Sequence, residues 1–144
     1  MAQTVRDISR DAGSQATARL RQAGLRPTRQ RVELAGLLFS DHDRHVTAES
    51  LHDEVTAAGV KVSLATVYNT LHQFTEAGLL RQVIVDAARS YFDTNTGDHQ
   101  HFFLEDEGML VDIPGETIAV SGVPVPPHGT SVDRVDVVVR VRRN

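Results

Sequence analysis

The N-terminal half of the chain contains four stretches in which apolar residues recur at helical spacing. The expected helices run from Ser14 to Ala23, from Thr28 to Leu38, from Thr47 to Ala58 and from Ser63 to Ala77. Three of them open with a hydroxyl residue, whose side chain can accept a hydrogen bond from a free N–H of the first turn. The predicted N-caps are Thr28, Thr47 and Ser63.

After Gly78 the apolar period changes from helical to alternating, which is typical of strands. Leu80–Val85 and Arg89–Asp93 flank a short polar turn and predict a β-hairpin. Helices followed by a hairpin are the order of a winged helix-turn-helix. The helices at Thr47–Ala58 and Ser63–Ala77 are the expected pair, and the hairpin is the expected wing. The polar stretch Ser40–His45 is expected to end the second helix.

The C-terminal part of the chain has strand patterns only, at His101–Glu105, Met109–Ile113 and Val135–Val141. We therefore predict an α+β protein, with a winged helix-turn-helix domain over residues 1–93 and a small α/β dimerisation domain over residues 94–144. So short a segment buries little core by itself, so a second copy would cover its strands and valines. Packing onto the N-terminal domain is the alternative.

Composition restricts the protein class further. Hydrophobic residues make up 40% of the sequence and charged residues 24%, as in soluble globular proteins. No run approaches the roughly 18 apolar residues of a membrane span, and the N-terminus lacks the apolar core of a secretory signal, so we expect a cytoplasmic protein. Cysteine is absent, which excludes disulfides, thiolate zinc sites and cysteine nucleophiles. Any metal site must use His, Asp and Glu.

The net charge of −4 combines a basic N-terminal end with an acidic C-terminal end. Residues 1–31 carry seven arginines against Asp7 and Asp11, whereas residues 98–144 carry four arginines against eight acids. The basic N-terminal end can meet phosphates, which suggests a nucleic-acid partner. A chance excess of charge on solvated faces is the plain alternative.

The fourth predicted helix has a polar face suited to DNA. Its inward positions are Leu64, Val67, Leu71 and Phe74, and its outward positions are Ala65, Thr66, Tyr68, Asn69, His72 and Gln73. Thr66 and Tyr68 can contact thymine methyl groups, and Asn69 can pair with adenine in a major groove. The N–H groups near Ser63 can meet a phosphate. An ordinary amphipathic helix with a solvated face is the alternative.

His99 and His101 lie two residues apart in an extended segment, so both imidazoles are expected on one side. Two such nitrogens can share a metal ion, with a carboxylate such as Asp98 alongside. Surface histidines also fall at this spacing by chance. His42, His52 and His72 are expected to face solvent, and His128 to lie in a loop.

Three motifs together resemble the ferric uptake regulator (Fur) superfamily. They are GLRPTRQR at residues 24–31, HVTAE at 45–49 and SLATVYNTL at 63–71, and the similarity runs in order over roughly residues 18–113. The resemblance implies a dimeric winged-helix regulator of a palindromic operator. It also implies base contacts from Tyr68 in the major groove, with Thr66 and Asn69 beside it, and places Arg26 near the adjacent minor groove.

From charge and position we infer phosphate contacts for Arg29 and Arg31, although either could simply be solvated. The resemblance further implies a metal site made by His45, Asp93, His99 and His101, with Asp93 where Glu is more usual. Histidine and carboxylate ligands suit Fe(II), Mn(II) or Zn(II). Such a metal would bias the dimer toward or away from operator geometry.

The chain departs from the family pattern in two places. Leu104 and Glu107 stand where a CxxC pair usually holds structural zinc, and Gln100 and Ala119 stand where a third site has ligands. These losses and the final VDRVDVVVRVRR strand resemble the iron response regulator (Irr) branch, whose members respond to haem. His99 or His101 could be an axial haem ligand, although Gln100 replaces the middle histidine of the usual motif.

We therefore predict an iron-responsive regulator, not an enzyme, that responds to haem or to a divalent metal. A divalent-metal sensor without haem is one alternative. Another is a small metallohydrolase built on His99, His101 and Asp93, although the sequence offers no evident general base with a substrate pocket. A metal-storage module without a DNA role is the third.

Overall fold

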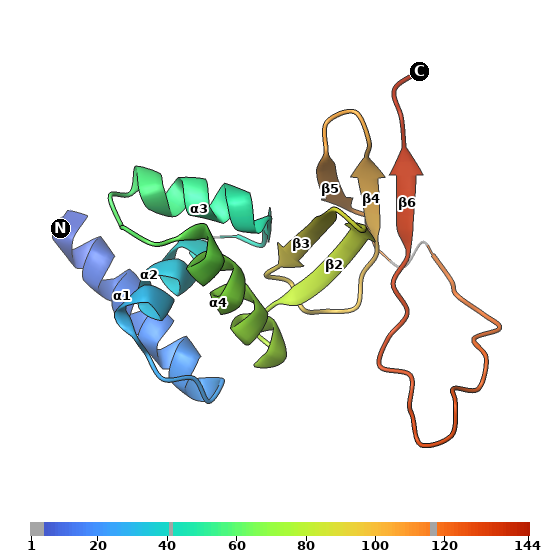
Figure 1. The fold of residues 1–144 in the computed structure, drawn as a ribbon, viewed down its shortest axis with the longest axis horizontal. Coiled ribbons are helices and arrows are strands. Elements are labelled where there is room, and N and C mark those ends of the chain that lie inside the picture. Colours follow the sequence, from blue (N-terminus) through green and yellow to red (C-terminus); the bar gives the residue numbers. More distant parts are fainter. Residues whose placement is uncertain (1–4, 41, 116–117) are drawn as a thin grey trace. The chain divides into compact units, whose positions relative to one another are not determined.

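The computed structural model describes residues 5–40, 42–115 and 118–144. The chain divides into two compact units, Met1–Thr96 and Gly97–Asn144 (Figure 1). The expected boundary at residues 93–94 falls just before this division. In the part of the chain that is described, no helix combines the length and the apolar character that crossing a membrane requires.

The first unit contains the four expected helices. They are α1 (Val5–Gln22), α2 (Arg29–Leu38), α3 (Ala48–Ala57) and α4 (Leu64–Glu76). Their apolar faces share one core, built around Leu20, Leu34, Leu51, Leu71 and Phe74. The predicted start of the first helix at Ser14 was wrong, because the residues before it lack the apolar stripe that periodicity detects.

All three predicted N-caps are confirmed. The hydroxyl of Thr28 accepts a hydrogen bond from the N–H of Arg31 at 3.3 Å. Thr47 and Ser50 form a capping box in which each side chain accepts from the other's N–H at 3.0 Å. Ser63 accepts from the N–H of Thr66 at 3.1 Å. These bonds fix where α2, α3 and α4 begin.

Replacing Ser63 with alanine tests the cap that positions α4. We expect Ser63→Ala to lower the free energy of unfolding by about 1 kcal/mol, because the N–H of Thr66 loses its acceptor. Chemical denaturation monitored by circular dichroism measures this. Ser121→Ala, at an exposed serine outside the helices, is the matched control. Equal stability of the two variants would contradict the capping role.

The wing is a three-stranded sheet in the order β1-β3-β2. It consists of β1 (His45–Val46), β2 (Arg81–Asp86) and β3 (Arg89–Asp93), and both pairings are antiparallel. The hairpin β2–β3 confirms the prediction. Strand β1 was not predicted, because a two-residue strand leaves no periodicity and exists only through its pairing with β3.

The second unit is a sheet in the order β5-β4-β6 (Figure 1). Its strands are β4 (His101–Leu104), β5 (Met109–Asp112) and β6 (Val138–Val141), with β5 antiparallel and β6 parallel to β4. None of the residues described after Gly97 lies in a helix. The predicted last strand began at Val135, but the Gln100 side chain bonds the Val137 N–H and the Val135 carbonyl there, in place of a strand ladder.

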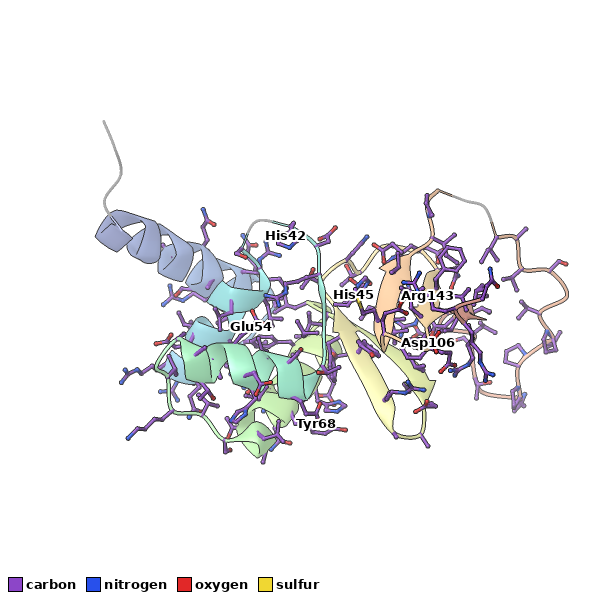
Figure 2. All side chains as sticks on the ribbon, turned by 90° about the horizontal axis from the view of Figure 1, so that it is seen from above. His42, His45, Glu54, Tyr68, Asp106 and Arg143 are labelled. Carbon is purple, nitrogen blue, oxygen red and sulfur yellow. The ribbon has the colours of Figure 1, made fainter. Side chains whose placement is uncertain are left out.

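Ion pairs hold the end of β6 to the acidic turn between β4 and β5. Arg140 pairs with Glu105 at 2.9 Å, and the Arg143 side chain pairs with Glu107. The Arg143 N–H also donates to the Asp106 carboxylate at 2.7 Å; Figure 2 labels these two residues. Glu107, at a position where the family pattern has a zinc-binding cysteine, thus holds this turn through an ion pair.

Candidate nucleic-acid interface and metal centre

The outward face of α4 carries most of the side chains predicted to read DNA. Tyr68, which Figure 2 labels, is 48% exposed. Asn69 is exposed and Thr66 is half-buried. The prediction that Leu64 faces inward was wrong, since this side chain is 42% exposed. Thr70 is buried instead and satisfies its hydroxyl by donating to the Thr66 carbonyl at 2.8 Å.

Two histidines expected in solvent are held by the fold. His72 is half-buried, with its ring edge-on to both Tyr68 and Phe92 at centroid separations of 4.5 and 5.4 Å. His52 is half-buried, and its Nε2 lies 2.9 Å from the Val62 carbonyl. Both predictions were wrong because Phe92 of β3 and the Val62 carbonyl before α4 come from other parts of the chain. The stack on Phe92 supports the Tyr68 ring in its outward position.

A basic loop before α2 is attached to α4. The Arg31 guanidinium donates to the Arg26 carbonyl at 2.9 Å and to Oε1 of Gln73, on α4, at 3.0 and 3.3 Å. These bonds join the loop to α4, and a phosphate contact from Arg31 stays a prediction. Arg26 and Arg29 are exposed. Positive charge thus stands beside the outward face of α4.

The tip of the wing is fixed by Asp86. Its carboxylate accepts from the Ala88 N–H at 2.9 Å and pairs with the Arg89 guanidinium at 2.5 Å. The hydrogen bond from Arg89 is the main reason that the pKa of Asp86 lies below its usual value, with the Ala88 N–H adding to it. The carboxylate is therefore ionised at neutral pH and keeps the turn in one conformation.

In the first unit, two of the predicted metal ligands meet. His45 of β1 and Asp93 of β3 are directly opposite each other, and His45 Nε2 lies 3.1 Å from an Asp93 carboxylate oxygen. The other oxygen of Asp93 accepts from the Asn95 N–H at 2.9 Å. Asp93 is buried and also lies opposite the buried Arg81 of β2, so the carboxylate has a cationic neighbour.

In the second unit, the other two predicted ligands converge on a third residue. Nε2 of His99 and Nε2 of His101 lie 3.4 and 3.3 Å from the same oxygen of Asp112. Asp112 of β5 is the register partner of His101 on β4. Asp98, expected beside the histidines, is exposed. The ligand atoms of these three converging residues lie within 4.8 Å of one another.

The hydrogen bonding of His99 determines which of its nitrogens can bind a cation. Nδ1 lies 2.7 Å from the Gly97 carbonyl, which only accepts, so Nδ1 carries the hydrogen. In the neutral ring, Nε2 then presents its lone pair toward the Asp112 carboxylate. Two imidazole nitrogens and a carboxylate oxygen this close together can share a metal ion. Orientation of a ligand histidine by a backbone carbonyl is typical of metal sites.

The sequence prediction missed Asp112. The signal that could have found it is the register of the hairpin β4–β5, in which Leu104 pairs with Met109 and His101 therefore pairs with Asp112. Because alternate residues of paired strands share a face, an acid opposite His101 stands beside both histidines.

Comparison with known proteins adds independent support. Residues 22–137 match the model of the ferric uptake regulator family. The chain belongs to this family. A peroxide-responsive repressor, PerR, of Staphylococcus aureus is 37% identical over 66% of this chain and 64% of its own length, so somewhat less than two thirds of that relative is matched.

Solved structures agree with the fold. The manganese-containing ferric uptake regulator of Pseudomonas aeruginosa is 30% identical, with a TM-score of 0.66 over 89% of this chain and 97% of that one. The regulator of Vibrio cholerae is 23% identical, with a TM-score of 0.70 over 88% and 98%. The predicted superfamily and the winged-helix α+β fold are confirmed. Membership of the iron response regulator branch stays a prediction.

Proposed function

We propose that this chain is a transcriptional regulator that binds operator DNA as a dimer and adjusts its affinity to iron supply. The observation that supports this most is the convergence of His99 and His101 on Asp112, with the His99 lone pair directed at the carboxylate. A cation-binding group of this kind in a ferric uptake regulator family member favours a metal-responsive regulator over an enzyme.

We propose that His45 and Asp93 contribute to the same ion, as the family resemblance implies. Together with the trio of the second unit, they would offer three imidazole nitrogens and two carboxylates. This set suits Fe(II), Mn(II) or Zn(II), and it contains no thiolate that would favour a softer ion. An ion with ligands from both units would couple them, so that its binding favours one arrangement of the DNA-binding units.

Haem is the other iron-bearing ligand that the Irr resemblance implies. His99 Nε2 has the tautomer that an axial haem ligand needs, since Nδ1 donates to the Gly97 carbonyl. However, the His101 side chain is buried and both nitrogens point at one carboxylate oxygen. Convergence on a single point favours a small ion, so we propose the divalent metal as the signal.

The DNA-binding part of the proposal rests on α4 and the loop before α2. Tyr68, Thr66 and Asn69 would contact base edges, and the first turn at Ser63 would meet a phosphate. The exposed Arg26 and Arg29 would add contacts to the sugar-phosphate backbone. Two such surfaces related by a dimer axis would match a palindromic site.

The dimer is proposed from the apolar surface of the second unit. Several large aliphatic side chains are exposed there, namely Val111, Val120, Val123, Val125 and Val132. Val125 is 93% exposed, which is unusual for a valine in an ordered domain without a partner. A second copy of this unit would cover them.

Titration of the purified chain with Mn(II), Fe(II) and haemin in separate experiments tests the proposed signal. We expect saturable Mn(II) binding with about one ion per chain, followed by the electron paramagnetic resonance of free Mn(II). A Soret shift on adding haemin that disappears in His99→Ala, together with no saturable metal binding, would overturn the divalent-metal proposal in favour of haem.

Asp112→Asn distinguishes the two ligands further. The substitution removes one anionic oxygen donor beside both histidines, so we expect Mn(II) affinity to fall at least about tenfold. The same substitution leaves both imidazoles, so haemin binding through His99 would be unaffected. Asp98→Asn, at an exposed acid nearby in sequence, is the control. Unchanged Mn(II) affinity in Asp112→Asn would exclude this residue as a ligand.

A further inference from the structure

Arg44, the residue before the candidate ligand His45, ties the start of β1 to two helices. Its guanidinium forms a two-pronged pair with Glu54 of α3, with N–O distances of 2.9 and 2.5 Å. The same group donates to the Leu37 carbonyl in the last turn of α2 at 3.2 Å. Figure 2 labels His45 and Glu54. A forked pair of this kind fixes orientation as well as charge.

The backbone of Arg44 extends the pairing of the two ligand-bearing strands. The Arg44 N–H donates to the Thr94 hydroxyl at 2.9 Å, and the Thr94 N–H donates to the Arg44 carbonyl at 3.1 Å. This pair directly follows the pair His45–Asp93 in the register. A slip of one residue would turn His45 to the opposite face, and the Arg44–Thr94 pair adds to the bonds that hold the register in which His45 lies 3.1 Å from Asp93.

We propose that Arg44 and Glu54 are positioning residues that hold His45 and Asp93 in ligand geometry and join them to α3. This rests on the proposed function, in which His45 and Asp93 bind the metal. The chain passes from β1 through Thr47 into α3, and α3 packs against the reading helix α4. Arg44 therefore adds a second, side-chain link between the candidate ligand and the helix-turn-helix.

The test compares two carboxylate-to-amide changes at adjacent positions of α3. Glu54→Gln removes the charge from the fork, whereas Asp53→Asn makes the same charge change at an exposed neighbour. Each variant is titrated with Mn(II), and its affinity for a duplex selected by the wild-type protein is measured with and without Mn(II). We expect Glu54→Gln to lose up to about tenfold in Mn(II) affinity, because loss of the fork frees the start of β1 and with it the His45–Asp93 pair. Asp53→Asn should match the wild type.

Metal-free operator affinity separates positioning from a general structural defect. We expect Glu54→Gln to bind the duplex normally without Mn(II). The factor by which Mn(II) changes its duplex affinity should be at least about fivefold smaller than in the wild type. Arg44→Lys keeps the charge without the fork and should act in the same direction. The double variant should be no worse than the more affected single variant, because both changes break one interaction.

Thermal unfolding establishes that each variant is folded, and Arg44→Lys carries the test if Glu54→Gln is not. The inference is overturned if the folded variants bind Mn(II) and respond to it like Asp53→Asn. The proposed function then still stands, because the duplex affinity of the wild-type chain still changes with Mn(II). A wild-type chain without any Mn(II) response would overturn both.

Discussion

Replacing Tyr68 with alanine is expected to abolish tight operator binding while leaving the fold intact. One base contact is worth about 1–3 kcal/mol, and a dimer presents two copies, so affinity should fall by about 30-fold or more. The side chain is 48% exposed and meets the His72 ring edge-on. The free energy of unfolding should therefore change by no more than about 0.5 kcal/mol. Fluorescence anisotropy with a selected duplex measures the affinity.

The salt dependence of operator affinity distinguishes the loss of a base contact from the loss of a charged contact to the phosphates. Tyr68→Ala removes no charge, so the slope of log affinity against log salt should stay as in the wild type. Arg26→Ala is the counterpart, and we expect it to weaken binding to all sequences while lowering the slope by about one. Wild-type affinity in folded Tyr68→Ala would show that α4 does not read the operator.

Loss of His99 is expected to have the second large effect. His99→Ala removes a nitrogen that lies 3.4 Å from the Asp112 carboxylate, so metal affinity should fall by about 100-fold, ten times the loss expected for Glu54→Gln. Metal-free binding to DNA should be unchanged, since the residue lies outside the first unit. Isothermal calorimetry with Mn(II) and anisotropy with the duplex provide the two measurements.

His128→Ala is the matched control for this prediction, because His128 is an exposed histidine in a loop. It removes the same chemical group from the same unit and should leave Mn(II) affinity at the wild-type value. Equal loss in both variants would point to general surface binding by histidines. No loss in His99→Ala would remove this residue from the proposed site.

Local patterns predicted most of the first unit correctly. The caps at Thr47 and Ser63 depend on residues within one turn, so the sequence alone contains the necessary information. The face of α4 was predicted in part: Leu64 is exposed on the first turn, and His72 is half-buried. The apolar stripe of a helix gives the average direction of its buried face. Whether residues at the end of the helix are buried depends on the neighbouring elements.

Features formed by distant residues could not be predicted from local patterns. Strand β1 exists because His45 pairs with Asp93, and His72 is half-buried because it stacks on Phe92. Asp112 joins the candidate site through hairpin register. Sequence spacing placed His99 and His101 on one side, but only the fold shows that a carboxylate faces both.

The central claim is that metal binding changes DNA affinity, and one comparison tests it most directly. The affinity of the wild-type chain for a selected duplex is measured in excess Mn(II), again after chelation, and once more after Mn(II) is restored. We predict a change of at least about fivefold that reverses with chelation and returns with the ion, and that is absent in His99→Ala. Equal affinities in all three conditions would contradict the account.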